Sequence, residues 1–235
     1  MLNREKHELV MTQILKDVYA DTFIGPLLGF KGGTAAYLFY GLERFSVDLD
    51  FDLLEVSEEK RTIVFDRISQ ILLQYGTIRD SQQKENTIFL LLSYGAGEYG
   101  IKVEVNTRKV GSLYEMKQYF GIPMLVMKKE SMFASKLIAL IERKKFAARD
   151  MYDVYYFLKN NWDIDINVLN KYGKKNIVSF LDECIHFVEN TPDNSLLGGL
   201  GELVEETKKD FIRNKMKMEI VFFLSIRKEQ YKKRY

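Results

Sequence analysis

A strict alternation of apolar and polar residues runs from Ser46 to Leu54. Successive side chains of a β-strand point to opposite faces, so this pattern predicts a strand with one buried face. The apolar face carries Val47, Leu49, Phe51 and Leu53, and the polar face carries Ser46, Asp48, Asp50 and Asp52. A similar alternation over Ile101–Thr107 and the apolar run Thr87–Tyr94 predict two more strands. Because a glycine-rich link joins these two segments, we expect an antiparallel hairpin.

Helical spacing of apolar residues frames these strands. It predicts one helix over residues 3–20 and another that begins at Ser57. Leu27–Phe30 has the composition of a short strand. We expect Gly32-Gly33 to form a turn after it, and Thr34 to act as the N-cap of a helix over residues 35–42.

After Pro123 the pattern becomes helical. Helical spacing covers residues 130–159, with a possible break near 144–146, and then residues 176–190 and 201–231. We therefore predict an α+β fold with two domains. Residues 1–125 form a mixed sheet flanked by helices, and residues 126–235 form a helical domain.

Composition narrows the classes of function. The chain has 46% hydrophobic residues and a net charge of +2, so it is globular and any nucleic-acid surface must be local. Cys184 is the single cysteine, which excludes an internal disulfide and fits a reducing cytoplasm. No apolar run approaches the roughly 20 residues of a membrane span. His7 and His186 lack partners at zinc-ligand spacing, and we expect both to be surface or half-buried structural residues.

Carboxylates on the predicted strands indicate hard-cation chemistry. Asp48 and Asp50 lie two residues apart on one strand, so their side chains point the same way with alpha-carbons about 6–7 Å apart. Glu104 lies on the polar face of a second strand. If the strands are neighbours, the three carboxylates meet, and the expected bound metal ion is Mg²⁺ (or Mn²⁺). Asp52 shares this face, and we expect it to be a solvated neighbour.

The Gly32-Gly33-Thr34 segment has the character of a phosphate site. Glycines allow backbone to approach a phosphate closely, and a helix N-terminus offers unpaired N–H groups. Lys31 and the Thr34 hydroxyl add further donors. Each motif alone also has a plain structural interpretation, as a solvated strand edge or as a turn. The order of strand, glycine pair, helix, acidic strand and third acid favours the functional interpretation.

The segment Lys31–Phe51, KGGTAAYLFYGLERFSVDLDF, closely resembles the first signature of the AbiEii/AbiGii toxin family. That family belongs to the DNA polymerase beta-like nucleotidyltransferases and includes toxins of type IV toxin–antitoxin and abortive-infection systems, with the related MenT toxins. The resemblance implies Mg²⁺ at Asp48 and Asp50, and nucleotide phosphates at Gly32, Gly33 and Thr34. Ser46, a further expected nucleotide contact, and Arg44 also match the signature.

Two later segments, Lys136–Arg143 and Ala148–Tyr155, resemble the family's motifs that pair a helical lysine with an Arg-Asp-x-x-Asp helix. Lys136 and Arg143 lie on one edge of an apolar stripe, where Lys136 either snorkels to water or contacts the triphosphate, with Arg143 the weaker nucleotide ligand. Asp150, favoured over Asp153 for chemistry, either accepts the acceptor's proton or orients Lys136. The structural alternative is a buried ion pair with Arg149 or with a lysine. We expect this helical domain to complete the active-site cleft.

These observations predict an enzyme that transfers a nucleoside monophosphate from an NTP to an acceptor hydroxyl. The resemblance implies RNA as acceptor, at the tRNA 3′ end, and a toxin role with a separately encoded antitoxin. The basic tail 227–235 is either a solvated end or an RNA contact. Two alternatives stay open: a nucleotidyltransferase acting on a small molecule such as an antibiotic, and a non-catalytic nucleotide-binding regulator.

Overall fold

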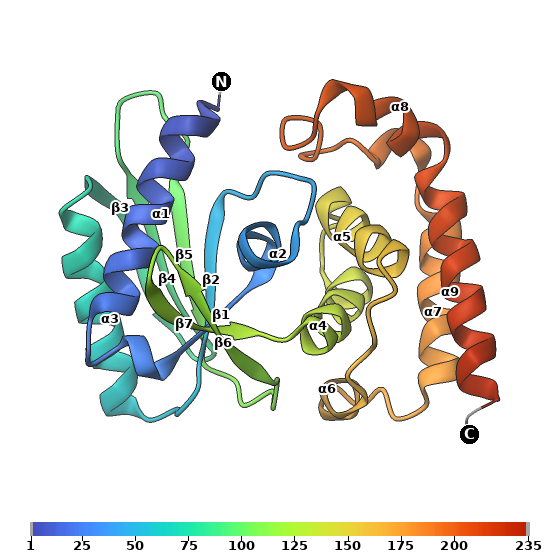
Figure 1. Ribbon diagram of the computed structural model, residues 1–235, viewed down its shortest axis with the longest axis horizontal. Coiled ribbons are helices and arrows are strands. Elements are labelled where there is room, and N and C mark those ends of the chain that lie inside the picture. The colour runs from blue at the N-terminus through green and yellow to red at the C-terminus, as the bar shows by residue number, and fades with distance from the viewer. Residues whose placement is uncertain (1, 234–235) are drawn as a thin grey trace. The chain divides into compact units, whose positions relative to one another are not determined.

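The computed structural model describes residues 2–233 and separates into two compact units (Figure 1). Unit 1 comprises the residues up to Gly41, Phe45–Lys109 and Leu113–Met127. Unit 2 comprises Leu42–Arg44, Val110–Ser112 and the residues from Lys128 onward. The chain thus passes from unit 1 to unit 2 mainly between Met127 and Lys128, at the end of the last strand.

Unit 1 is built on one mixed sheet. In the described residues, seven strands pair in the order β3-β4-β5-β2-β1-β7-β6. The strands β1 and β2 are antiparallel, whereas β2 and β5 are parallel neighbours. The elements are α1 (Arg4–Ala20), η1 (Gly25–Leu27), β1 (Leu28–Lys31), α2 (Gly32–Tyr40), β2 (Asp48–Leu53), α3 (Glu58–Leu73), β3 (Thr77–Lys84), β4 (Thr87–Ser93), β5 (Ile101–Asn106), β6 (Tyr114–Tyr119) and β7 (Ile122–Met127). The predicted α+β class is confirmed.

One face of this sheet is the apolar face. Figure 1 shows α1 and α3 together on one side of the strands. Leu49 and Phe51 of β2 are fully buried, and the Phe51 ring contacts that of Tyr19 on α1. Because side chains alternate along a strand, Asp48, Asp50 and Asp52 lie on the opposite face. The fold therefore gathers the predicted carboxylates on the face away from α1.

Several predicted elements are confirmed. Helix α1 begins after Asn3, whose side chain accepts a hydrogen bond from the Lys6 amide, and Ser57 caps α3 in the same way. The strands β4 and β5 form the expected antiparallel pair. The prediction that Thr34 is an N-cap is wrong, because α2 already begins at Gly32. Gly32 has φ +78°, and this left-handed conformation turns the chain from strand into helix without a separate turn.

Three strands, β3, β6 and β7, are not predicted by the sequence pattern. The edge strand β3 is mostly exposed, so it lacks the alternation that marks a half-buried strand. The strands β6 and β7 form an antiparallel hairpin through Phe120 and Gly121, which both have positive φ. Pro123 lies within β7, next to this turn, so the sheet continues beyond the proline after which the helical pattern is predicted to begin. A proline near a strand end is compatible with pairing to an edge strand.

Unit 2 is helical. Its elements are α4 (Lys129–Glu142), α5 (Ala148–Lys159), α6 (Ile166–Lys171), α7 (Ile177–Asn190), η2 (Asp193–Ser195), α8 (Glu206–Asn214) and α9 (Met216–Lys232). The predicted break near 144–146 is confirmed between α4 and α5. The helical pattern over 201–231 corresponds to two helices: residues 201–205 are not helical, and Lys215 separates α8 from α9. The short helix α6 was not predicted.

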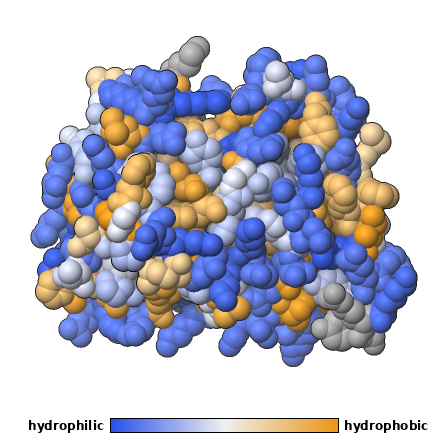
Figure 2. Space-filling view, viewed as in Figure 1, coloured by the Kyte–Doolittle hydropathy of each residue, from blue (hydrophilic) through white to orange (hydrophobic). Residues whose placement is uncertain are grey.

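Helix α9 carries an exposed apolar row. Met218, Phe222 and Ile226 recur every four residues and are exposed. Figure 2 shows apolar residues at the surface over this helix. Among the described residues, no helix is long and apolar enough to cross a membrane.

Candidate active site

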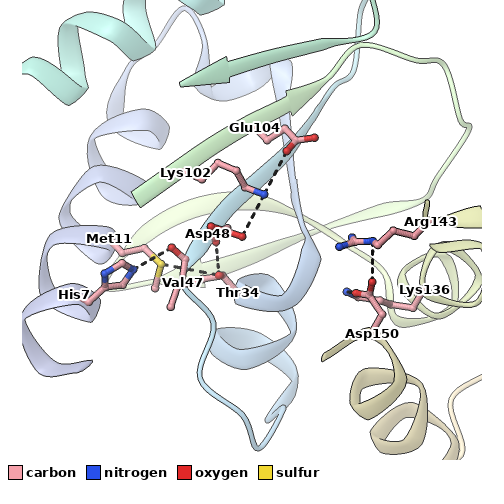
Figure 3. Close-up of polar contacts among 10 residues, drawn as sticks. All are labelled: His7, Met11, Thr34, Val47, Asp48, Lys102, Glu104, Lys136, Arg143 and Asp150. Carbon is pink, nitrogen blue, oxygen red and sulfur yellow. Dashed lines mark hydrogen bonds and ion pairs between the residues drawn. The ribbon is translucent and has the colours of Figure 1, made fainter. Parts of the chain in front are cut away.

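The loop from β1 into α2 holds the carboxylate strand in place. The Thr34 hydroxyl is buried and donates to the Asp48 carbonyl, which ties α2 to the start of β2 (Figure 3). A side chain at Gly32 would overlap Asp50 Oδ2 and come within 3.0 Å of its Cβ, so glycine is required beside this acid. Because its hydroxyl is engaged, Thr34 is left with its backbone N–H for any phosphate contact. Gly33 follows in the same first turn of α2.

The strands β2 and β5 bring the predicted acids together. In their parallel register, Asp50 lies opposite Glu104 and Asp48 lies opposite Lys102. The Lys102 ammonium is 3.3 Å from Asp48 Oδ2 and 3.4 Å from Glu104 Oε2 (Figure 3). The two acidic strands are therefore neighbours, and a lysine lies among the acids. Lys102 was not among the predicted site residues.

The charges on this face are unevenly matched. Burial raises the pKa of Asp50, and the nearby Asp48 and Glu104 raise it further against the opposing charges of Lys102 and Lys31. Such a site favours an additional cation, and carboxylate oxygens are the ligands that divalent hard cations prefer. The donor set therefore fits a divalent metal. Within residues 2–233, however, no three Asp, Glu, His or Cys side chains form a group that could hold a metal ion by themselves.

Asp52 is not the solvated neighbour that we predicted. It is only 6% exposed. Its carboxylate accepts hydrogen bonds from Lys31 Nζ, from the Tyr114 hydroxyl and from Asn106 Nδ2, the last at 2.7 Å. The sequence missed this cluster because Tyr114 comes from the unpredicted strand β6. Asp52 thus holds the side chain of Lys31, the residue that lies opposite Asp50 in the β1–β2 register.

His7 is structural, as predicted, but it is fully buried rather than half-exposed. Its Nε2 lies 3.0 Å from the Val47 carbonyl and its Nδ1 lies 2.8 Å from the Tyr94 hydroxyl. A neutral ring satisfies both contacts, with Nε2 donating and Nδ1 accepting. Burial lowers the pKa of His7, which keeps the ring neutral. His7 therefore fixes the residue that immediately precedes Asp48.

Unit 2 contains a separate cluster of buried charges. Lys136 Nζ lies 2.6 Å from Asp150 Oδ1 and 2.9 Å from Asp153 Oδ2. Arg44 binds both oxygens of Asp153, at 2.5 and 2.7 Å. Arg143 Nε lies 3.1 Å from Asp150 Oδ2 (Figure 3). Arg44, from the first signature, thus meets residues of the two later motifs in one place. Arg44 and Asp153 are 109 residues apart in sequence.

The contacts of this cluster bear on the alternatives for Lys136 and Asp150. The Lys136 side chain is only 14% exposed, so the lysine does not snorkel to water. Burial opposes its charge, but Asp150 and Asp153 raise its pKa. Burial likewise opposes ionisation of Asp150, yet Lys136 and Arg143 lower its pKa. A carboxylate stabilised in this way is a weak base, so the geometry favours Asp150 as the residue that orients Lys136.

Two other predicted positions have simpler surroundings. Ser46 is 7% exposed and lies two residues before Asp48. In the tail, Arg227 donates to Asn161 and to the Trp162 carbonyl, and Lys228 pairs with Asp182. These intramolecular contacts agree with a packed helix end. Residues 234–235 of the predicted tail lie outside the described residues.

A family model described as "Nucleotidyl transferase AbiEii toxin, Type IV TA system" matches residues 13–232. The chain belongs to this AbiEii family. It is therefore a nucleotidyltransferase, and the expected resemblance is confirmed over nearly the whole sequence. No curated protein matches the chain.

Two solved structures from Helicobacter pylori have a fold similar to that of this chain. One, a candidate nucleotidyltransferase, is 20% identical with a TM-score of 0.63, covering 99% of this chain and 97% of its own. The other, JHP933, is also 20% identical with a TM-score of 0.61, covering 100% of this chain and 96% of its own. At this identity the likeness supports the fold alone.

Proposed function

We propose that the protein transfers a nucleoside monophosphate from an NTP to an acceptor hydroxyl and releases pyrophosphate, with Mg²⁺ held by Asp48 and Asp50. The observation that carries this proposal is the arrangement of the acidic face. Asp50 lies opposite Glu104, beside the Gly32 turn, and burial and like charges raise its pKa. A bound divalent cation would polarise the phosphates and neutralise charge that develops on them.

The chain's own groups have separate tasks in this proposal. The first N–H groups of α2, at Gly32 and Gly33, bind phosphate oxygens, because a helix N-terminus has unpaired donors. Asp52 holds the Lys31 ammonium by a direct ion pair, which restricts where this cation lies. Lys31 therefore presents its charge to the nucleotide with little loss of side-chain freedom.

In unit 2, Lys136 is the proposed phosphate ligand. Asp150 and Asp153 hold its ammonium on two sides, and both carboxylates are themselves held by arginines. The cluster fixes the lysine in one position and keeps it charged. Arg143 is 42% exposed at the side chain and gives the cluster its accessible edge. We propose that both the acidic face and this cluster are needed for NTP use.

We propose RNA as the acceptor, with the tRNA 3′ end as the specific site. A local basic segment supports a nucleic-acid acceptor over a small molecule. Arg143, Lys144 and Lys145 are consecutive and exposed to solvent, and Phe146, which follows them, is 37% exposed. Cations bind phosphates without regard to sequence, and an aromatic ring can stack on a base. The AbiEii family further supports a toxin role with a separately encoded antitoxin.

The direct test is to incubate the purified protein with each α-labelled NTP, Mg²⁺ and total RNA. We expect one size class of RNA to gain label from one preferred NTP, and no label with Asp50→Asn. Digestion of the labelled RNA then locates the added nucleotide. Label on a small molecule from a cell extract, and none on RNA, would reject the RNA acceptor and favour the small-molecule alternative.

A further inference from the structure

Lys102 is a cation in the middle of the acidic face. It comes from β5, a strand paired on both sides, by β2 and by β4. Its ammonium contacts both Asp48 and Glu104, whereas Lys31 on the same face is paired with Asp52. Lys102 is thus the lysine whose contacts coincide with the proposed metal ligands.

We propose that Lys102 is an exchangeable counter-ion of the acidic face. It bridges Asp48 and Glu104, and it turns to the NTP polyphosphate when a divalent cation takes these carboxylates. This inference rests on the proposed function, since it assigns the same carboxylates to the metal. It adds a residue that competes with the metal and then contributes to substrate binding.

The local charges require such an exchange. An ammonium 3.3–3.4 Å from two carboxylate oxygens occupies the region where a bound cation would contact the same oxygens. Two like charges a few ångströms apart repel strongly in a partly buried site. A metal held by the same carboxylates would weaken both contacts of Lys102, because its charge repels the ammonium. A lysine ammonium is a compact charge on a flexible stem, so it can leave by rotation of its own side chain.

The surroundings of Lys102 permit this movement. Its side chain is 25% exposed, so the ammonium has a path to solvent. The β5 backbone is held by two ladders, which leaves the side chain as the moving part. NTP brings negative phosphates to this face together with the metal. The displaced ammonium then has a new anionic partner on the face that it already occupies.

The test measures metal binding and NTP use separately in Lys102→Met. Mn²⁺ binding to the nucleotide-free protein is followed by electron paramagnetic resonance, and steady-state transfer gives kcat/KM for NTP. We expect Mn²⁺ affinity to rise by about tenfold or more, because a competing charge is lost. We expect kcat/KM for NTP to fall by roughly 10²-fold, because a cation on the phosphates is lost. Lys102→Arg should keep weak Mn²⁺ binding, since it keeps the charge.

Lys84→Met is the matched control, because Lys84 is an exposed lysine at the end of β3 in the same sheet. It should leave both quantities unchanged. Unchanged or weaker Mn²⁺ binding by a folded Lys102→Met protein overturns the proposal. Tighter Mn²⁺ binding with unchanged NTP use overturns the exchange to the polyphosphate. Failure of the proposed function is distinct, because the wild type would then transfer no nucleotide while the Mn²⁺ shift would still be measurable.

Discussion

The acidic face of unit 1 and the buried cluster of unit 2 both contain carboxylates and lysines, but their charges are balanced differently. In unit 2, Asp150 and Asp153 are almost fully buried, and Lys136, Arg44 and Arg143 surround them. Burial opposes the charge of Asp150, but Lys136 and Arg143 lower its pKa. On the acidic face, Lys102 bridges Asp48 and Glu104, and burial and the neighbouring carboxylates raise the pKa of Asp50.

This difference separates two kinds of polar site. A cluster whose charges are matched internally keeps one arrangement and positions its members. A face with surplus negative charge gains from a cation that comes from solution. We therefore expect substitutions on the acidic face to act on metal binding and transfer, and substitutions in the unit 2 cluster to act on both stability and transfer.

The largest expected effect is loss of transfer in Asp48→Asn and in Asp50→Asn. Each change removes a proposed metal ligand, and we expect label transfer to fall to background. Burial and neighbouring carboxylates raise the pKa of Asp50, so ionised Asp50 destabilises the metal-free fold near neutral pH. Urea unfolding without metal should therefore show Asp50→Asn to be at least as stable as wild type. Substantial transfer by either variant would contradict the metal assignment.

Lys136→Met should lower kcat/KM for NTP by roughly 10²-fold. It should also lower the melting temperature, because removing one partner of a buried ion pair costs about 3–5 kcal/mol. The double variant Lys136→Met/Asp150→Asn separates the two effects. The second substitution removes the negative charge of Asp150 that Lys136 no longer compensates, so stability should partly return while transfer stays low. Recovery of transfer along with stability would show that Lys136 is only structural.

Gly32→Ala should lower transfer by roughly 10-fold to 10²-fold, because a misplaced reactive group is costly. The added methyl group overlaps Asp50 Oδ2 and displaces this carboxylate. Gly121→Ala is the matched control, since Gly121 has the same φ of +78° with nothing within 4 Å of an added Cβ. Both variants should lose stability by urea unfolding because of the positive φ, and Gly32→Ala should lose at least as much as Gly121→Ala. Equal transfer by the two would contradict the role of Gly32 beside Asp50.

The smallest expected effect is a pH dependence of stability from His7. Burial lowers the pKa of His7 in the folded protein, so the unfolded chain binds its proton first as pH falls. The contribution of His7 to the free energy of unfolding is complete above the ordinary histidine pKa of 6.5. It declines as pH falls below this value, by at most about 1.4 kcal/mol per pH unit. His7→Gln should flatten this part of the urea-unfolding profile. An unchanged slope would mean that His7 is protonated in the fold.

The sequence predicts this protein well where the pattern is local. The alternation of β2 places Asp48 and Asp50 on one face, and helical spacing finds the break between α4 and α5. It fails where pairing is non-local or polar. The bridge from Lys102 depends on the parallel β2–β5 register, and the burial of Asp52 depends on Tyr114 from an edge strand with little apolar periodicity. Neither relation leaves a periodic signal.

The central claim is that the acidic face binds a divalent cation needed for nucleotide transfer. The most direct measurement is pyrophosphate release from each NTP with total RNA, titrated with Mg²⁺, for wild type and Asp50→Asn. We predict release by wild type that requires Mg²⁺ and saturates with it, and no release by Asp50→Asn at any Mg²⁺ concentration. Metal-independent release, or equal Mg²⁺ dependence in the two proteins, would contradict the claim.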